Sequence, residues 1–115
     1  MLEGPVDLIE EKRGKITVLK LKGRLDAITS PKTEICIIKC IDRGQHQILL
    51  NFSDVDYLSS AGMRMLLTTT KKLKPFSGKL VLCSVKVNVM DVLRMSGFDH
   101  LLEITASQDA GLEKF

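Results

Sequence analysis

Two adjacent serines, Ser59 and Ser60, stand where a side-chain hydroxyl could take part in phosphoryl chemistry. They open an expected helix and precede two small residues, Ala61 and Gly62, which leave room for another protein to approach closely. The first turn of a helix has unpaired backbone N–H groups and the positive end of the helix dipole, so phosphate is favoured there. A phosphate on a serine at this position would add about 1.5 to 2 negative charges. A plainer interpretation is also open, with Ser59 as the helix N-cap and Ser60 as an ordinary first-turn residue.

The elements that position these serines are predicted from hydrophobic patterns. The apolar run Gln47–Asn51 predicts a strand buried on both faces, and Lys79–Val85 predicts a second central strand. A polar loop containing Asp54 and Asp56 leads from the first strand to the helix, and Pro75 ends that helix. The two aspartates are expected to be solvated, with Asp54 making an Asx turn. The buried stripe of the helix is expected to consist of Met63, Leu66, Leu67 and Leu73.

The first part of the chain predicts two strands and a helix. The strands are expected over Val6–Glu10 and Ile16–Lys22, joined by a hairpin turn, with Gly23 ending the second. Ser30 as N-cap and Pro31 as the first helical residue predict the start of the helix. Its buried face is expected to carry Ile35, Ile38 and Ile41, with Cys36 and Cys40 beside them.

The C-terminal part continues the alternation of helices and strands. Asn88 is expected to cap a helix that Gly97 ends, Phe98–Ile104 returns to the sheet edge, and Ser107 opens a short final helix. The resulting order is β-β-α-β-α-β-α-β-α. It predicts a single α/β domain over residues 1–115, with a mixed sheet of four or five strands and helices mainly on one face.

The composition excludes several classes of protein. Hydrophobic residues make up 44% of the 115 residues and aromatic residues only 4%, so the core must be aliphatic. The low aromatic content and a net charge of +3 argue against nucleic-acid binding. We find no apolar run long enough to cross a membrane and no secretory signal, so we expect a cytoplasmic protein without direct membrane contact. The three cysteines, Cys36, Cys40 and Cys83, are expected to be buried reduced thiols rather than metal ligands or a disulfide.

Three segments resemble motifs of the STAS family (sulfate transporter and anti-sigma antagonist). Asp54-Val-Asp-Tyr-Leu-Ser-Ser-Ala-Gly-Met resembles the phosphorylation loop of the bacterial anti-sigma factor antagonists, which are single-domain members of that family. Gly23-Arg-Leu-Asp-Ala-Ile-Thr resembles the second motif, a turn that leads to the first helix. Leu93-Arg-Met-Ser-Gly-Phe resembles the third, which closes the last long helix. Together they cover nearly the whole chain in the expected order.

The resemblance implies a binding protein rather than an enzyme. The unphosphorylated form of such a protein binds an anti-sigma factor that is also a serine kinase, and this frees the sigma factor. The kinase then uses its own bound ATP to phosphorylate the antagonist, and the complex separates. A PP2C-type phosphatase restores binding. The antagonist itself needs no cofactor and no metal, and its oligomeric state stays open.

The resemblance also assigns the phosphorylated residue. In the family pattern Asp-Ser-(Ser/Thr)-Gly-Leu-Gly the acceptor lies two residues before the first Gly, which here is Ser60 before Gly62. Ser59 stands in place of the family's Asp, Ala61 in place of its second Ser/Thr, and Arg64 in place of its second Gly. Loss of the Asp either alters recognition by the kinase or marks a member that is not phosphorylated. Arg64, one turn after Ser60, either pairs with a phosphate or extends into solvent.

The partner-binding residues that the resemblance implies come from two places in the chain. Asp26 lies in the turn that matches the second motif, and it either contacts a partner or caps its own turn. Met63 and Met65, beside the serines, could be exposed for packing against a partner. An alternative function is a STAS-type interaction subunit of another complex, such as a membrane transport system, without phosphorylation. The full predicted set is Asp26, Ser59, Ser60, Ala61, Gly62, Met63 and Arg64.

Overall fold

The computed structural model describes residues 7–115 and contains a five-stranded mixed sheet in the order β1-β2-β3-β4-β5. The predicted alternation of strands and helices is confirmed, with two short 3-10 helices in addition. The strands are β1 (Asp7–Arg13), β2 (Ile16–Leu25), β3 (Gln47–Leu58), β4 (Lys79–Cys83) and β5 (Glu103–Thr105). The helices are α1 (Thr29–Asp42), α2 (Ser60–Leu73), η1 (Lys74–Phe76), α3 (Val87–Met95), η2 (Phe98–His100) and α4 (Gln108–Leu112).

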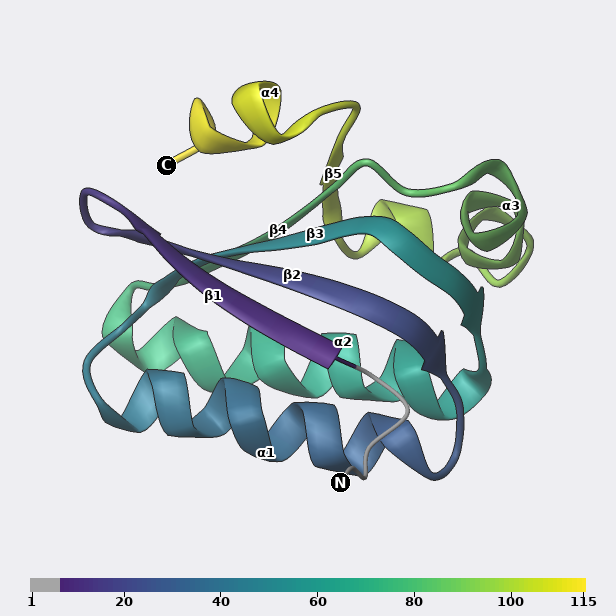
Figure 1. The fold of residues 1–115 in the computed structure, drawn as a ribbon, viewed down its shortest axis with the longest axis horizontal. Coiled ribbons are helices and arrows are strands. Elements are labelled where there is room, and N and C mark those ends of the chain that lie inside the picture. The colour runs from purple at the N-terminus through teal and green to yellow at the C-terminus, as the bar shows by residue number, and fades with distance from the viewer. Residues whose placement is uncertain (1–6) are drawn as a thin grey trace.

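The helices are placed unequally around the sheet. β1 pairs antiparallel with β2, and the other neighbouring strands pair in parallel. The helices α1 and α2 run side by side under one face of the sheet, and the short α4 lies over the other (Figure 1). α3 lies at the end of the sheet where β2 and β3 finish (Figure 1). The carboxyl ends of the central strands therefore meet the starts of α1, α2 and α3 at one end of the molecule.

The core is aliphatic, as the composition predicts, and it has two parts. The larger cluster fills the space between the sheet and the α1–α2 layer, and includes Leu19, Leu21, Leu50, Phe52 and Leu66. The smaller cluster lies on the opposite face under the C-terminal segment, and consists of Val18, Leu49, Val81 and Cys83 with Leu112 and Phe115 packed against it. Both faces of β3 are thus buried where the sequence shows a continuous apolar run, which confirms that prediction.

The first three strands extend further than the sequence predicts, whereas β4 ends at Cys83 instead of Val85. The predicted strand from Phe98 begins only at Glu103, because Phe98–His100 is a 3-10 helix. β1 reaches Arg13 instead of ending at Glu10, while Val6 of the predicted strand lies outside the described residues. β2 continues through Gly23, which has a φ of 116°, to Leu25. The register of β2 against β3 shifts between Gly23 and Arg24, so the glycine accommodates a bulge instead of ending the strand.

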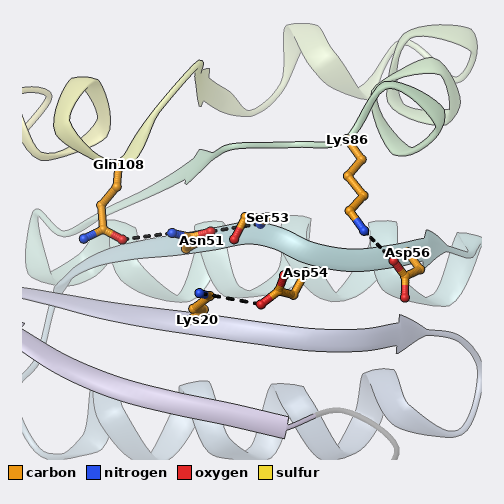
Figure 2. Close-up of polar contacts among 7 residues, drawn as sticks. All are labelled: Lys20, Asn51, Ser53, Asp54, Asp56, Lys86 and Gln108. Atoms are coloured by element: carbon orange, nitrogen blue, oxygen red, sulfur yellow. Dashed lines mark hydrogen bonds and ion pairs between the residues drawn. The ribbon is translucent and has the colours of Figure 1, made fainter.

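The expected polar loop before α2 is the second half of β3. It pairs in parallel with the end of β2, where Leu25 lies opposite Leu58. Val55 and Leu58 are both buried although they are three residues apart, because the register shift against β2 places one extra residue of β3, Asp56, between them. Asp54 consequently makes no Asx turn, and its carboxylate lies 3.6 Å from the Nζ atom of Lys20 on β2 (Figure 2).

The buried face of the first helix agrees with the predicted one only in part, since Ile41 and Cys40 are buried and Ile38 is half-buried. Its buried residues include Thr33, Ile37 and Ile41, whereas Ile35 is 55% exposed and Cys36 is exposed as well. Nearly every position from 35 to 41 is apolar, so periodicity alone does not define one stripe there. The expectation that all three cysteines are buried is therefore wrong for Cys36. Burial raises the pKa of the thiols of Cys40 and Cys83.

Candidate partner-binding site

The start of α2 is tied to the end of β2 through Ser59. Its backbone N–H and its hydroxyl both donate hydrogen bonds to the carbonyl oxygen of Leu25, each over 2.9 Å. The hydroxyl oxygen also accepts a hydrogen bond from the backbone N–H of Gly62 at 3.2 Å. Ser59 is thus the N-cap of α2 and uses its hydroxyl as both donor and acceptor. Its side chain is committed to the fold.

Ser60 differs from Ser59 in its position in the helix, its exposure and its hydrogen bonding. It is the first residue of α2, its side chain is exposed, and within residues 7–115 its hydroxyl makes no hydrogen bond. The first turn of α2 carries no acidic side chain that would neutralise the positive end of the helix. Ser60 therefore presents a free hydroxyl to solvent at a place where a negative charge is electrostatically favoured.

Asp26 lies in the turn that follows β2. Its Oδ1 atom accepts hydrogen bonds from the backbone N–H groups of Ile28 and Thr29, both at 2.9 Å. These hydrogen bonds lower the pKa of the Asp26 carboxyl from its ordinary value, and the one from the Thr29 backbone has the largest effect. Asp26 therefore caps its own turn. It accepts the hydrogen bonds before α1 that the sequence analysis assigned to Ser30 as N-cap. The contact with Leu25 made by Ser59 brings this turn next to the start of α2.

A third element joins this end of the sheet. The Nζ atom of Lys86, just before α3, pairs with the Asp56 carboxylate near the end of β3 (Figure 2). The Asn88 side chain donates to the Asp56 carbonyl oxygen at 2.9 Å and so does not cap α3. The hydrogen bond from Lys86 lowers the pKa of the Asp56 carboxyl. The Asp56 side chain is thus solvent-exposed, as expected, but it lies on β3 instead of in a loop, and it contacts the residues around the start of α3.

Exposed apolar side chains lie at the same end of the sheet as Ser60. Ile28 before α1 is 68% exposed, Val87 at the start of α3 is 78% exposed, and Tyr57 near the end of β3 is exposed too. The Tyr57 ring carries the guanidinium of Arg24 at 4.1 Å from its centroid. Sequence reasoning did not single these residues out. The available signal was that each follows or ends a strand close to a helix start, where parallel strand ends converge.

The remaining predicted site residues separate into packing and exposed positions. Gly62 is buried, and a Cβ atom there would lie 2.6 Å from Leu58 Cδ1, so its small size serves packing and leaves no room for a partner. Met63 is also buried and receives a contact from the Ser96 hydroxyl at 3.3 Å from its Sδ atom. Burial of Met63 in the stripe of α2 is therefore confirmed, and the alternative that Met63 and Met65 are exposed for a partner is wrong. Arg64 is exposed and forms no ion pair within the described chain.

The middle of β3 serves the fold. Asn51 donates a hydrogen bond to the side chain of Gln108 at 2.9 Å and accepts one from the backbone of Ser53, which fixes α4 to the sheet (Figure 2). Across residues 7–115, no three His, Cys, Asp or Glu side chains gather as a metal site would require. In the same part of the chain, no helix is long and apolar enough to cross a bilayer.

The fold and this site define a class of protein. The STAS domain model matches residues 8–110, so the chain belongs to the STAS domain family. It is 30% identical over 108 residues to BtrV of Bordetella bronchiseptica, provisionally named an anti-sigma factor antagonist, covering 94% of this chain and 93% of that protein. It is 28% identical over 97 residues to the anti-sigma F factor antagonist of Paenibacillus polymyxa, covering 84% and 82% of the two chains.

A solved structure supports the same fold. The crystal structure of an anti-sigma factor antagonist from Mycobacterium paratuberculosis superimposes with a TM-score of 0.85. The match covers 98% of this chain and 97% of that one at 21% sequence identity. At this identity the likeness establishes the architecture of the sheet and its helices, and the family resemblance inferred from the three motifs agrees with it.

Proposed function

We propose that this protein is an anti-sigma factor antagonist, and that phosphorylation of Ser60 ends its binding to the anti-sigma factor. The observation that carries this proposal is the contrast between two adjacent serines. The Ser59 hydroxyl is engaged by Leu25 and Gly62, while the Ser60 hydroxyl is exposed and free within the described residues. A kinase can therefore reach Ser60 without unfolding the start of α2. The names of the curated relatives support the same role.

Phosphorylation would act on the interface more than on the fold. In the free protein, a phosphate on Ser60 would face the positive end of α2 and remain hydrated. In a complex, the same dianion would lose its water inside an interface shaped for a hydroxyl. The exposed Ile28, Tyr57 and Val87, at the same end of the sheet as Ser60, would supply the apolar area that such an interface buries. The unmodified form would therefore bind and the modified form would separate.

The partners follow from this role. The anti-sigma factor would also be the serine kinase and would hold the ATP, and a PP2C-type phosphatase would reverse the modification. The protein itself would bind no cofactor and would act by association, without catalysis of its own. Control of sigma factors takes place where transcription does, so we place the protein in the cytoplasm. Asp26, Ala61 and Arg64 would form the rim of the contact with the partner.

The test compares binding of the cognate anti-sigma factor by four proteins. These are the wild type, Ser60→Ala, Ser60→Asp and the control Ser77→Asp, which adds the same charge at an exposed position beyond α2. We expect Ser60→Asp to bind at least about tenfold more weakly, and the other two variants to bind like the wild type. Added ATP should increase the intact mass of the wild type by one phosphate and leave Ser60→Ala unchanged. Equal binding by all four, with no gain in mass, would favour the static STAS-type interaction subunit.

A further inference from the structure

A groove of about 270 Å³ separates the N-terminal halves of α1 and α2, and we call it the α1–α2 groove. The two helices lie side by side under the sheet (Figure 1). Both helices contribute residues to the lining of the groove. It begins beside Ser60, because Ala61 belongs to its lining. The lining residues are Ser30, Pro31 and Glu34 from α1, and Ala61, Arg64, Met65 and Thr68 from α2.

The floor of the groove contains a hydroxyl without a partner. Ser30 is only 2% exposed, and its Oγ atom makes no hydrogen bond in the structure. The backbone N–H of Ser30 donates to the Asp26 carbonyl oxygen, but the hydroxyl does not share that acceptor. An unpaired buried hydroxyl is unfavourable, and most buried polar atoms in folded proteins are paired. Because Asp26 caps α1, the hydroxyl of Ser30 is not needed for the start of that helix.

The two rims of the groove carry opposite charges that are not paired with each other. Glu34 on α1 offers only acceptor atoms, and Arg64 on α2 offers only donor groups. Within residues 7–115 neither side chain forms an ion pair. A charged group entering the groove would be attracted by one rim and repelled by the other. An uncharged amide carries a donor and an acceptor at once and so complements both rims.

We propose that the α1–α2 groove receives an amide group of the anti-sigma factor, either a side-chain amide or a backbone peptide, which hydrogen-bonds to Ser30. This inference rests on the proposed function, because the groove continues directly from the surface around Ser60. The Ser30 oxygen has almost no surface open to solvent in the free protein. The partner group therefore reaches it only after the atoms that cover Ser30 have shifted.

The groove and the modification are coupled through Arg64. In α2, Arg64 lies four residues after Ser60, so a phosphate on Ser60 comes within reach of its guanidinium. Charge-assisted pairing with the phosphate would draw Arg64 away from the groove and remove its donor rim. Phosphorylation would then weaken binding in two ways, by placing a dianion in the interface and by depriving the partner's amide of one contact.

The principal variant is Ser30→Ala, tested against the anti-sigma factor. Loss of one hydrogen bond to the partner should weaken binding by about three- to tenfold. Thermal unfolding of the free variant should occur at the wild-type temperature or higher, because the hydroxyl has no partner there. The matched control is Thr33→Val on the same helix. Its hydroxyl is buried but bonded to the Thr29 carbonyl oxygen, so this variant should lose stability and keep its affinity.

The outcomes separate the groove from the proposed function. If the wild type binds the anti-sigma factor and Ser30→Ala binds it equally well, the groove proposal is overturned while the antagonist function stands. If the wild type binds no anti-sigma factor, both are overturned. If Ser30→Ala binds more weakly only because it is less stable, the groove proposal also fails.

A small-molecule probe tests the chemistry of the groove directly. N-methylacetamide, acetate and methylammonium are titrated into the isotope-labelled protein, and NMR shifts are followed at Ser30, Ala61 and the Met65 methyl group. N-methylacetamide should shift these signals in the wild type and not in Ser30→Ala, and the two ions should have smaller effects. Equal responses to all three molecules, or no response at these residues, would contradict selection of an amide.

Discussion

The carbonyl oxygen of Leu25 accepts two hydrogen bonds from Ser59, one from its backbone N–H and one from its hydroxyl, each 2.9 Å long. Leu25 is the last residue of β2 and Ser59 is the N-cap of α2, so this pair joins two segments 34 residues apart. The Asp26 turn follows Leu25 directly, and Ser60 follows Ser59. The contact between Leu25 and Ser59 therefore positions Asp26 and Ser60, although neither of these two residues takes part in it.

Removal of the Ser59 hydroxyl should weaken the fold. Ser59→Ala loses an N-cap and a hydrogen bond to Leu25, and we expect a loss of about 1–3 kcal/mol in the free energy of unfolding. Denaturant unfolding followed by circular dichroism measures this loss. Ser60→Ala is the control and should change stability by less than about 0.5 kcal/mol. Equal effects of the two substitutions would mean that the two hydroxyls do not have the separate roles described above.

Gly62 tests whether close packing or helix propensity dominates at the start of α2. An alanine is usually favoured over glycine inside a helix by about 1 kcal/mol. Here its Cβ would lie 2.6 Å from Leu58 Cδ1 and 3.1 Å from Leu25 atoms, including the backbone oxygen that Ser59 uses. We therefore expect Gly62→Ala to destabilise the protein by about 1–3 kcal/mol, as overpacked cores do. Thermal unfolding measures this effect. A stabilised variant would show that Leu25 and Leu58 can shift to accommodate the added methyl group at little cost.

The sequence predicts the order of elements well because each element has its own local signal. Alternation defines the strand from Ile16, and Ser107 and Gly97 have the predicted roles at the start of α4 and the end of α3. The predicted bounds are wrong where an element's extent depends on pairing with another part of the chain. β3 extends to Leu58 only because the end of β2 pairs with it.

In the candidate site, too, the residues predicted correctly have a local signal and the others depend on tertiary packing. Ser60 and Ser59 could be found from local pattern and family motif, because both lie at a helix start. The contacts of Ser96 with Met63 and of Lys86 with Asp56 depend on how α3 packs against α2 and β3, which one segment alone does not specify. Ile28 and Val87 were missed because a single exposed apolar residue is common on protein surfaces, and only their position after a strand distinguishes them.

The Asp26 carboxyl should make stability depend on pH at the acid end. Its pKa is lower in the folded protein than in the unfolded chain, so its contribution is complete above the unfolded pKa near 4 and is lost as the pH falls through the folded value. Asp26→Asn should therefore lose less stability than the wild type when the pH is lowered from about 5 to about 2. Urea unfolding across this range measures the difference. Glu113→Gln, at an exposed position after α4, controls for loss of a charge, and an unchanged pH profile in Asp26→Asn would contradict this role.

The three thiols should react at two very different rates. Cys36 is exposed on α1, whereas Cys40 and Cys83 are buried, and burial raises their pKa and lowers the fraction of reactive thiolate. A disulfide reagent such as DTNB should modify one thiol rapidly in the folded protein and all three after denaturation. Cys36→Ser should abolish the rapid phase. Two rapid thiols in the wild type would mean that α1 does not keep Cys40 buried.

A negative charge at Ser60 should have opposite effects on the free protein and on its complex. Ser60→Asp places a carboxylate in the first turn of α2, which has no acidic side chain, so the helix dipole should stabilise the free protein by about 0.3–1 kcal/mol at low ionic strength. Ser60→Asn is the uncharged control, and added salt should reduce the gain of Ser60→Asp alone. Unfolding at low and high salt measures the effect, and binding to the anti-sigma factor is measured on the same samples. A variant that is more stable yet binds more weakly would locate the action of the charge in the interface, whereas parallel losses of stability and affinity would mean that the charge disrupts the start of α2 itself.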